Sequence, residues 1–225
     1  MKSKTTIAID GPVGAGKSTI SREVARRLGF IYVDTGALYR TLGVYCDENG
    51  IDVGDDSATA EYLTQRKPDV SLRFVEGVQR VFAEGDDFTD KIRTPKASML
   101  ASRISANPAV RAYLLDLQRS FSEKESVVMD GRDIGTVVLP KADVKIFLTA
   151  DAAERAKRRY DELVEKGIAA DYEQVLANLN KRDYDDSHRE HAPLKQAHDA
   201  VLVDTTGSDF EGSVEKVLGV INDVR

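Results

Sequence analysis

The chain of 225 residues carries a formal net charge of −6, and 41% of its residues are hydrophobic. This length fits one large α/β domain, or one domain with insertions, and no apolar run reaches the roughly 18 residues of a membrane span. The acidic balance argues against binding to a nucleic acid polymer, which generally needs a basic face. Cys46 is the single cysteine, and the N-terminal residues lack the apolar core of a signal peptide, so we expect a cytoplasmic protein.

The first predicted elements are a strand, a glycine-rich loop and a helix. Residues 6–9 form a short apolar run, and residues 11–18, GPVGAGKS, then fit the pattern G-x-x-x-x-G-K-[ST] without a mismatch. Apolar residues follow at helical spacing as far as Gly29. Between a strand and a helix, the pattern predicts a phosphate-binding loop. Glycines let successive backbone N–H groups turn toward an anion, and the helix N-terminus favours negative charge.

Two side chains of this loop carry specific expectations. Lys17 is expected to reach the β- and γ-phosphates of a nucleoside triphosphate, and Ser18 is expected to hold Mg²⁺. The alternative is a glycine-rich turn with an incidental lysine. Because the residues on both sides of the loop have the predicted strand and helix patterns, we favour the phosphate-binding interpretation.

Residues 30–33 are a second predicted strand, which ends at Asp34 where a helix over about 37–46 opens. Strand, helix, strand and helix in this order imply a parallel sheet. Residues from about 49 to 90 depart from it. A polar segment with a short helix precedes two alternating runs, 70–75 and 78–82, which predict a β-hairpin turning at Glu76-Gly77. Since an antiparallel hairpin is foreign to a parallel sheet, we interpret this region as an insertion.

The rest of the chain returns to alternating helices and strands. Asn107 and Pro108 are an expected N-cap and first helical residue, and Asp151 with Glu154 is expected to cap an Arg-rich helix. The remaining predicted elements are strands at 127–130, 144–148 and 200–203, and helices at 92–104, 107–121, 171–182 and 210–224.

Five predicted core strands in this order define an α/β fold with a five-stranded, parallel, doubly wound sheet. Ligands of such sheets gather at the carboxyl ends of the strands. The groups predicted at those ends are Gly11–Ser18, Asp34-Thr35, Asp130–Asp133, Thr149–Asp151 and Asp204–Thr206. Their convergence on one edge predicts one active site.

Several charged residues are candidates for handling phosphate. Asp130 follows the third core strand, where phosphate-loop enzymes keep a carboxylate near Mg²⁺ through water. Arg40 has a guanidinium suited to bidentate contact with phosphate. Arg155 and Arg159 share one helix face, and alternating Arg and Asp follow at 182–189. A strand-terminating turn and solvated, salt-bridged helices are the alternatives for these groups.

The sequence resembles the bacterial-type cytidylate (CMP) kinase family over nearly its whole length. The Asp130–Pro140 and Arg182–Leu194 segments are the most diagnostic, whereas many phosphate-loop kinases share the first segment. The residues that carry the resemblance are IAIDGPVGAGKST, DTGALYR, IRTPKASMLAS, NPAVR, QRSF, DGRDIGTVVLP, VKIFL with ERAKRR, and RDYDDSHREHAPL.

The resemblance implies a P-loop kinase fold made of a single domain, 1–225, with a nucleoside-monophosphate-binding insert at 36–111 and a helical lid at 151–191. It implies transfer of the γ-phosphoryl group of ATP to CMP or dCMP. The residues implied to bind ATP are Gly11, Pro12, Val13, Gly14, Ala15, Gly16, Lys17, Ser18 and Thr19, with Arg155, Arg158 and Arg159 on the lid. The residues implied to bind CMP are Thr35, Tyr39, Arg40, Ser102, Arg111, Arg132, Asp133, Arg182, Asp186 and Arg189.

Within that set, the resemblance implies that Ser102, Arg111 and Asp133 read the cytosine edge. It also implies that Arg40 and Arg132 hold the monophosphate, that Arg182 and Asp186 contact the sugar, and that Arg189 spans the transferring phosphates. Lys17, Arg132, Arg182 and Arg189 are accordingly the expected catalytic residues, with Ser18 and, through water, Asp130 at Mg²⁺.

Two other kinds of protein fit the loop. Another small phosphoryl transferase is one, but shikimate kinases generally lack this hairpin insert and adenylate kinases lack the Asp130–Pro140 segment. A nucleotide-dependent switch is the other, and it would need a guanine-specifying N-K-x-D, for which Asn180–Asp183 is only a near match on a predicted helix. We expect no nucleic acid or membrane partner, and a monomer.

Overall fold

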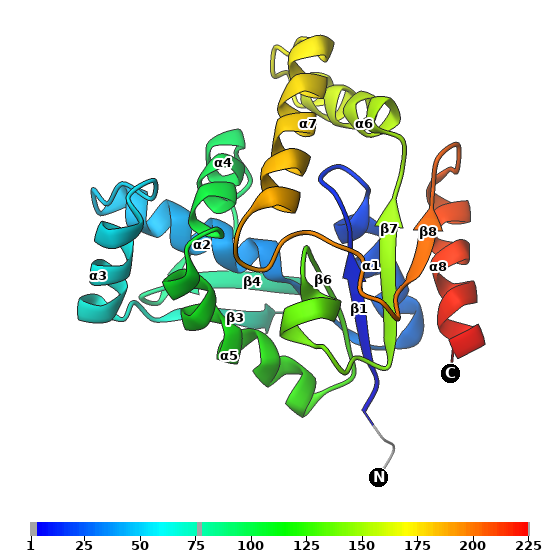
Figure 1. The fold of residues 1–225 in the computed structure, drawn as a ribbon, viewed down its shortest axis with the longest axis horizontal. Coiled ribbons are helices and arrows are strands. Elements are labelled where there is room, and N and C mark those ends of the chain that lie inside the picture. Colours follow the sequence, from blue (N-terminus) through cyan, green and yellow to red (C-terminus); the bar gives the residue numbers. More distant parts are fainter. Residues whose placement is uncertain (1–3, 76–77, 225) are drawn as a thin grey trace. The chain divides into compact units, whose positions relative to one another are not determined.

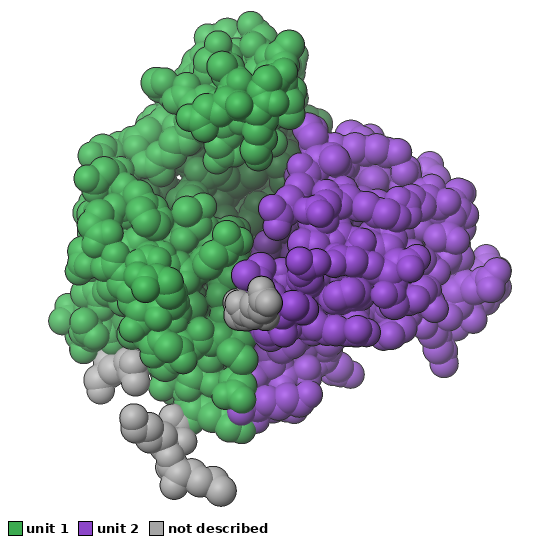
Figure 2. Space-filling model, turned by 180° about the vertical axis from the view of Figure 1, so that it is seen from behind, with its two compact units in different colours: residues 1–32, 125–225 green, residues 33–124 purple. Residues whose placement is uncertain are grey.

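The computed structural model describes residues 4–75 and 78–224. The chain divides into two compact units, which Figure 2 colours separately. The first unit comprises residues 1–32 and 125–225, and the second comprises residues 33–124. The expected insert, 36–111, falls inside the second unit, and the expected lid, 151–191, falls inside the first. As functional parts, both remain predictions.

The first unit is built on a five-stranded sheet with the strand order β2-β6-β1-β7-β8 (Figure 1). The chain passes into the second unit within the edge strand β2. β1 lies at the centre and pairs in parallel with β6 and β7, and β7 pairs in parallel with β8. This is the predicted parallel sheet, and its strands are β1 Thr6–Asp10, β2 Ile31–Asp34, β6 Val127–Gly131, β7 Val144–Thr149 and β8 Val201–Asp204.

Two helices, α1 (Lys17–Leu28) and α8 (Phe210–Val224), pack on one face of this sheet. Ile20 and Val24 of α1 and Val217 of α8 are buried there against alternate residues of β1 and β7. Each such side chain contributes about 1.5–3 kcal/mol on burial. Because successive strand residues point to opposite faces, the residues between them, Ala8 and Asp10 among them, lie on the other face. The π-helix η1 (Ile134–Val138) lies on that second face.

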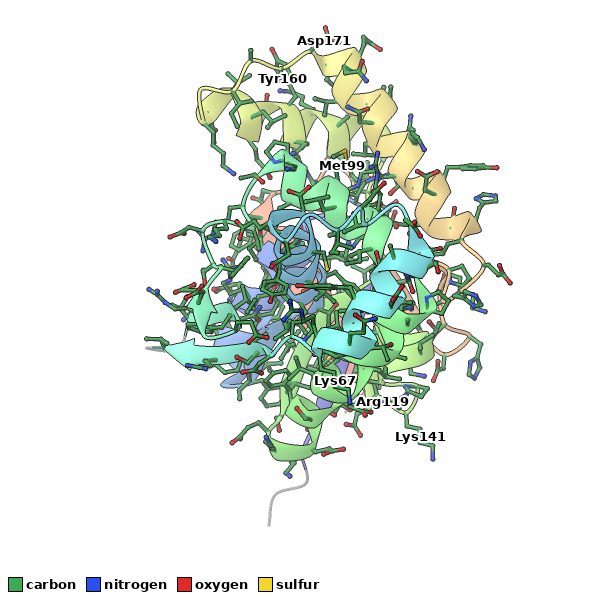
Figure 3. The ribbon with its side chains drawn as sticks, turned by 90° about the vertical axis from the view of Figure 1, so that its left-hand side faces the viewer. Lys67, Met99, Arg119, Lys141, Tyr160 and Asp171 are labelled. Carbon is green, nitrogen blue, oxygen red and sulfur yellow. The ribbon has the colours of Figure 1, made fainter. Side chains whose placement is uncertain are left out.

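The helices α6 (Ala152–Glu165) and α7 (Tyr172–His188) form a packed pair within the first unit. Tyr160 and Tyr172 meet edge to face with ring centroids 6.2 Å apart, and Tyr160 lies at the same end of the pair as Asp171, the N-cap of α7 (Figure 3). Asp151 caps α6 as predicted, accepting from the N–H groups of Ala153 and Glu154.

The second unit combines a small sheet with helices. Asp34 caps α2 by accepting from the N–H of Ala37, and Thr94 caps α4 by accepting from the N–H of Ala97. These caps provide acceptors for N–H groups in the first turn, which have no hydrogen-bond partner within the helix. The sheet has the order β3-β4-β5, with antiparallel pairing. The elements are α2 Thr35–Glu48, α3 Asp56–Arg66, β3 Val70–Val75, β4 Val78–Ala83, β5 Asp86–Asp87, α4 Pro95–Ile104 and α5 Pro108–Lys124.

The predicted strands and helices are confirmed to within a few residues at most ends, with four differences. The helix predicted to end at Lys181-Arg182 continues to His188 as α7. The predicted hairpin gains the short third strand β5, and the π-helix η1 was not predicted. Glu154 does not close a capping box, because the N–H of Asp151 donates instead to Oγ1 of Thr206. The predicted turn at Glu76-Gly77 lies outside the described residues.

No helix among the described residues is both long and apolar enough to cross a membrane.

Candidate active site

The loop after β1 has the backbone that its glycines predict. Gly14 and Gly16 adopt φ values of +74° and +81°, in the left-handed region that side chains disfavour. Gly11 has φ +151°, and a Cβ there would lie 2.0 Å from the backbone oxygen of Leu148 in β7. The loop therefore leaves β1 in direct contact with β7, the neighbouring strand in the sheet, and reaches the N-terminus of α1 at Lys17.

Lys17 is buried, and its Nζ donates to the backbone oxygen of Pro12 at 2.6 Å. Burial, together with the nearby Arg132, lowers the pKa of this ammonium to about 7, although Asp130, Asp10 and Asp186 oppose the shift. A buried cation with a like charge beside it gains free energy from an added negative charge. Lys17 is thus held where an anion is favoured.

Ser18, Asp130 and Tyr32 form a chain of hydrogen bonds beside the loop. The Ser18 hydroxyl donates to Oδ2 of Asp130 at 2.8 Å, and the Tyr32 hydroxyl donates to Oδ1 of the same carboxylate at 3.0 Å. Hydroxyl and carboxylate oxygens are the donors that Mg²⁺ prefers. The donor set at the predicted Ser18–Asp130 position therefore fits Mg²⁺, with its other ligands left to phosphate oxygens and water.

Arg132, Arg182 and Asp186 form a charged cluster on the same unit. Nε of Arg132 donates to Oδ2 of Asp186 at 2.9 Å. Burial lowers the pKa of Arg182 below its usual range, and Arg132 lowers it further. Within the described residues, the buried Nε of Arg182 has no hydrogen-bond partner. Because a buried donor without an acceptor is costly, this cluster also favours an added anion.

Arg189 follows the end of α7 and turns back toward η1. Its Nε donates to the backbone oxygen of Ala192 at 2.6 Å, and its Nη2 lies 3.5 Å from Oδ1 of Asp133. Both side chains are buried. The structure therefore brings together two residues that are separated in the sequence and that were both predicted to bind the acceptor.

The arginines of α6 differ in their surroundings. Arg155 is buried and donates to the backbone oxygens of Ala150 and Val13 and to Oδ2 of Asp183. Arg158 pairs with Glu154 and donates to the backbone oxygen of Thr205. Arg159 is more exposed and pairs with Glu162 at 2.9 Å. Arg155 thus lies directly against the phosphate loop.

The second unit gathers its own predicted residues around α2 and α4. Arg40 donates to Oδ2 of Asp34 at 2.7 Å. The Arg111 guanidinium lies over the Tyr39 ring, 5.7 Å from its centroid, and also donates to the backbone oxygen of Ser105. The Ser105 hydroxyl donates in turn to the backbone oxygen of Ser102 at 3.1 Å. Thr35, at the start of α2, is buried.

Sequence reasoning missed three residues. Oδ1 of Asp183 accepts from the N–H of Val13 in the phosphate loop at 3.0 Å, while its other oxygen accepts from Arg155. Asp10 accepts from two backbone N–H groups of η1. Lys145 is buried and donates to Asp199 and to the backbone oxygen of Pro140. For Lys145, a signal existed, because it is a charged residue within the predicted apolar strand 144–148. Asp10 directly follows the predicted strand 6–9, so the strand pattern gave no such signal for it.

Asp10 gives a pH-dependent stability prediction. Burial raises the pKa of its carboxyl from 3.8 to about 6. Between these values the folded state holds a proton that the unfolded state has released, so the free energy of unfolding falls as pH rises through this window. The contribution of Asp10 amounts to about 2–3 kcal/mol.

We expect Asp10→Asn to lack this part of the pH dependence, as measured by urea unfolding between about pH 4 and 7. Asp143→Asn, at the opposite end of β1, serves as the control and should keep it. A variant at Asp10 whose pH profile parallels that of the unaltered protein would contradict the prediction.

The strand, phosphate loop and helix, with Lys17, Ser18 and Asp130 beside them, define the protein as a P-loop kinase. Similarity to solved structures supports this fold. One is a gluconokinase from Sinorhizobium meliloti, with a TM-score of 0.50 and 14% identity over 98% of this chain and 93% of the other. Another is an uncharacterized protein from Eubacterium ventriosum, with a TM-score of 0.55 and 15% identity over 98% and 99%.

Sequence comparison defines the family. The family model described as cytidylate kinase matches residues 7–223. A cytidylate kinase of Caldicellulosiruptor bescii is 49% identical over 96% of this chain and 94% of its own length. One of Carboxydothermus hydrogenoformans is 49% identical over 97% and 99%. The chain belongs to the cytidylate kinase family.

Proposed function

We propose that the protein transfers the γ-phosphoryl group of ATP to CMP or dCMP, giving ADP and CDP or dCDP. The observation that carries this proposal is a complete phosphate-loop site, with Lys17 buried against an arginine, in a chain of the cytidylate kinase family. A nucleotide-dependent switch would share the loop, but it gives no account of the Arg132, Arg182 and Arg189 group.

On the donor side, the backbone N–H groups of Gly11–Thr19 bind the ATP phosphates, and Lys17 donates to the β- and γ-phosphates. Arg155, Arg158 and Arg159 contribute from the predicted lid. Ser18 and, through water, Asp130 hold Mg²⁺, which neutralises charge on the phosphates when it is bound. The oxygen donors at Ser18 and Asp130 support this assignment.

On the acceptor side, Arg40 and Arg132 hold the monophosphate, and Arg182 and Asp186 contact the sugar. Asp133, Ser102 and Arg111 read the cytosine edge, Thr35 and Tyr39 complete the set of contacts, and Arg189 stabilises the transferring phosphoryl group. The buried Nε of Arg182 and the burial of Arg189 support roles for these guanidiniums toward an anion.

The reaction needs no general base. The attacking oxygen belongs to a phosphate whose second ionisation lies near pH 6, so it is mostly ionised at pH 7. Catalysis then rests on in-line positioning of the reactants and on charge stabilisation by Lys17, Arg132, Arg182 and Arg189. Closure of the lid, 151–191, would exclude water and suppress hydrolysis of ATP.

An assay of ADP formation with AMP, GMP, CMP, dCMP, UMP and dTMP as acceptors tests this function. We expect strong preference for CMP and dCMP, because a site that pairs with the cytosine amino group leaves buried groups unpaired when uracil binds. Little ADP should form without an added monophosphate. Equal use of UMP, or activity on AMP alone, would refute the proposal, and turnover independent of any monophosphate would favour a switch.

Asp34 links the α2 cap to Arg40 and gives a further prediction. One oxygen caps α2 and the other accepts from Arg40. Asp34→Ser keeps a capping oxygen and removes the carboxylate that accepts from Arg40, so we expect KM for CMP to rise by about tenfold with stability nearly unchanged. Asp34→Ala should show the same KM and also lose about 1 kcal/mol of stability.

Asp55→Ala is the matched control, because Asp55 caps α3 by accepting from Ser57 and Ala58. It should lose similar stability and keep the KM for CMP, as measured by steady-state kinetics and urea unfolding. An unchanged KM in both Asp34 variants would remove Arg40 from the proposed phosphate contact.

We further propose a cytoplasmic, monomeric protein without a nucleic acid or membrane partner. Cys46 supports the reducing compartment, because it is the single cysteine of the sequence and therefore forms no intramolecular disulfide.

A further inference from the structure

Asp10 is the last residue of β1, directly before the phosphate loop. Its two carboxylate oxygens accept from the N–H groups of Ile134 and Gly135, each at 2.7 Å. The side chain is 4% exposed. It lies on the sheet face opposite to the one on which α1 packs. The Ser18 hydroxyl donates to Asp130 and the Lys17 ammonium donates to Pro12, while the charge of Lys17 acts on Asp10 from nearby.

The two N–H groups belong to the first residues of η1, and the chain reaches them directly after Arg132 and Asp133. The backbone oxygen of Asp133 accepts from the N–H groups of Val137 and Val138, so the turn is tied into η1 from its other end as well. A carboxylate that accepts from two adjacent N–H groups fixes the orientation of both peptide units.

Gly135 lets the carboxylate come this close. A Cβ at this position would lie 3.3 Å from Oδ2 of Asp10 and 3.2 Å from Cδ of Lys145. Lys145 is itself held by Asp199 and by the backbone oxygen of Pro140. The peptide of Gly135 is therefore packed between two charged side chains of the central strands β1 and β7, which are paired neighbours in the sheet.

Holding a turn with a buried carboxylate costs free energy, because the charged group loses contact with water. Burial opposes its ionised form, and Asp133 opposes it further, while the two N–H groups and Lys17 favour it. Buried charge is weak evidence for stability, because well-packed apolar residues at the same place are often no worse for the fold. The arrangement is better explained by a need for orientation at residues 132–135.

We propose that Asp10 is a positioning residue for phosphoryl transfer, whose carboxylate holds the backbone of residues 133–135 so that Arg132 and Asp133 keep the orientation required by the acceptor nucleotide. The inference rests on the proposed function, since it takes Arg132 and Asp133 as acceptor residues. Asp10 ties the strand that begins the donor loop to the turn that carries the acceptor residues, and in this role it acts through the backbone of that turn.

The test compares Asp10→Asn with Asp143→Asn. The asparagine amide conserves volume but presents an NH₂ group where the second N–H needs an acceptor, so one hydrogen bond is lost. Asp143 accepts from the N–H and hydroxyl of Thr6 at the far end of β1, at 2.7 and 2.8 Å, and provides a control of the same chemistry. Asp10→Ser, which retains one acceptor oxygen, is the second variant.

NMR couplings and hydrogen exchange report on the hydrogen bonds themselves, and steady-state kinetics reports on their role. In the unaltered protein, NMR should detect scalar couplings across the hydrogen bonds from the amide nitrogens of Ile134 and Gly135 to the Asp10 carboxyl carbon. In Asp10→Asn, hydrogen exchange of these amides should accelerate. Steady-state kinetics should show KM for CMP raised by about tenfold or more, and KM for ATP within about twofold of the original value. Asp143→Asn should change neither KM.

The outcomes are distinguishable. Absence of CMP-dependent turnover in the unaltered protein refutes the proposed function, while the couplings still report on the Asp10 hydrogen bonds. Couplings present with unchanged KM and kcat in Asp10→Asn overturn the positioning role. Equal losses for both substrates, matched by Asp143→Asn, or failure of both Asp10 variants to fold, assign Asp10 to the fold alone and also overturn it.

Discussion

Replacing Arg189 with alanine is expected to lower kcat by about 10³-fold or more while the protein still folds. Arg189 is buried, lies 3.5 Å from Asp133 through Nη2, and is anchored by Nε to the backbone oxygen of Ala192. A guanidinium held in this way has a fixed orientation within its segment, so little further ordering of the side chain is needed before it stabilises charge on a transferring phosphoryl group.

Arg189→Ala also leaves the Asp133 carboxylate without this cation, so a second substitution is needed to interpret it. Arg189→Lys keeps the charge and loses the planar fork, and we expect it to recover only part of the rate. Arg26→Ala, at an exposed position of α1, is the control for removal of an arginine. Single-turnover rates with CMP measure the effect, and near-normal turnover in Arg189→Ala would exclude the assigned role.

Replacing Gly11 with alanine is expected to lower the free energy of unfolding by about 3 kcal/mol or more, or to prevent folding. The Cβ would lie 2.0 Å from the backbone oxygen of Leu148 in β7, and its own position is fixed by the backbone directly after β1. No side-chain rotation relieves this contact, so either β7 or the loop must move. Movement of the loop would also lower activity in any protein that still folds.

Gly219→Ala provides the contrasting control. Gly219 lies in α8, where a Cβ would meet nothing within 4 Å. Alanine is the better helix former, so we expect a gain of about 0.5–1 kcal/mol. Urea unfolding of both variants measures the difference, and a Gly11→Ala protein as stable as the original would show that the strand contact is not needed.

Local patterns were sufficient for most of the fold. Alternation predicted the hairpin, helical spacing predicted α1 and α8, and the glycine pattern predicted the loop with its positive φ angles. The end of α7 was missed because its last turns carry alternating Arg and Asp in place of an apolar stripe, and only Leu179 and Asp186 are buried in that helix. In these last turns the charged side chains pair with other residues, and the spacing of residues in the sequence does not reveal such pairs.

The sequence predicted which residues belong to the site better than it predicted the contacts between them. Lys17, Ser18 and Asp130 follow from the motif and from the strand end. Asp10 contacts residues 124 and 125 positions away, and Asp183 contacts a loop residue 170 positions away. No local pattern encodes such pairings, so their discovery required the arrangement of the sheet and helices in space.

The contact between Asp183 and the phosphate loop has a consequence for affinity. The N–H of Val13 is one of the donors that such a loop offers to an anion, and here it is engaged by a carboxylate of the same chain. The loop therefore carries an internal competitor, and the proposed nucleotide must replace that carboxylate before it can use this donor. The apparent dissociation constant of ATP then equals its intrinsic value divided by the fraction of molecules in which the carboxylate has left the donor, and this sets the ATP concentration needed to fill the site.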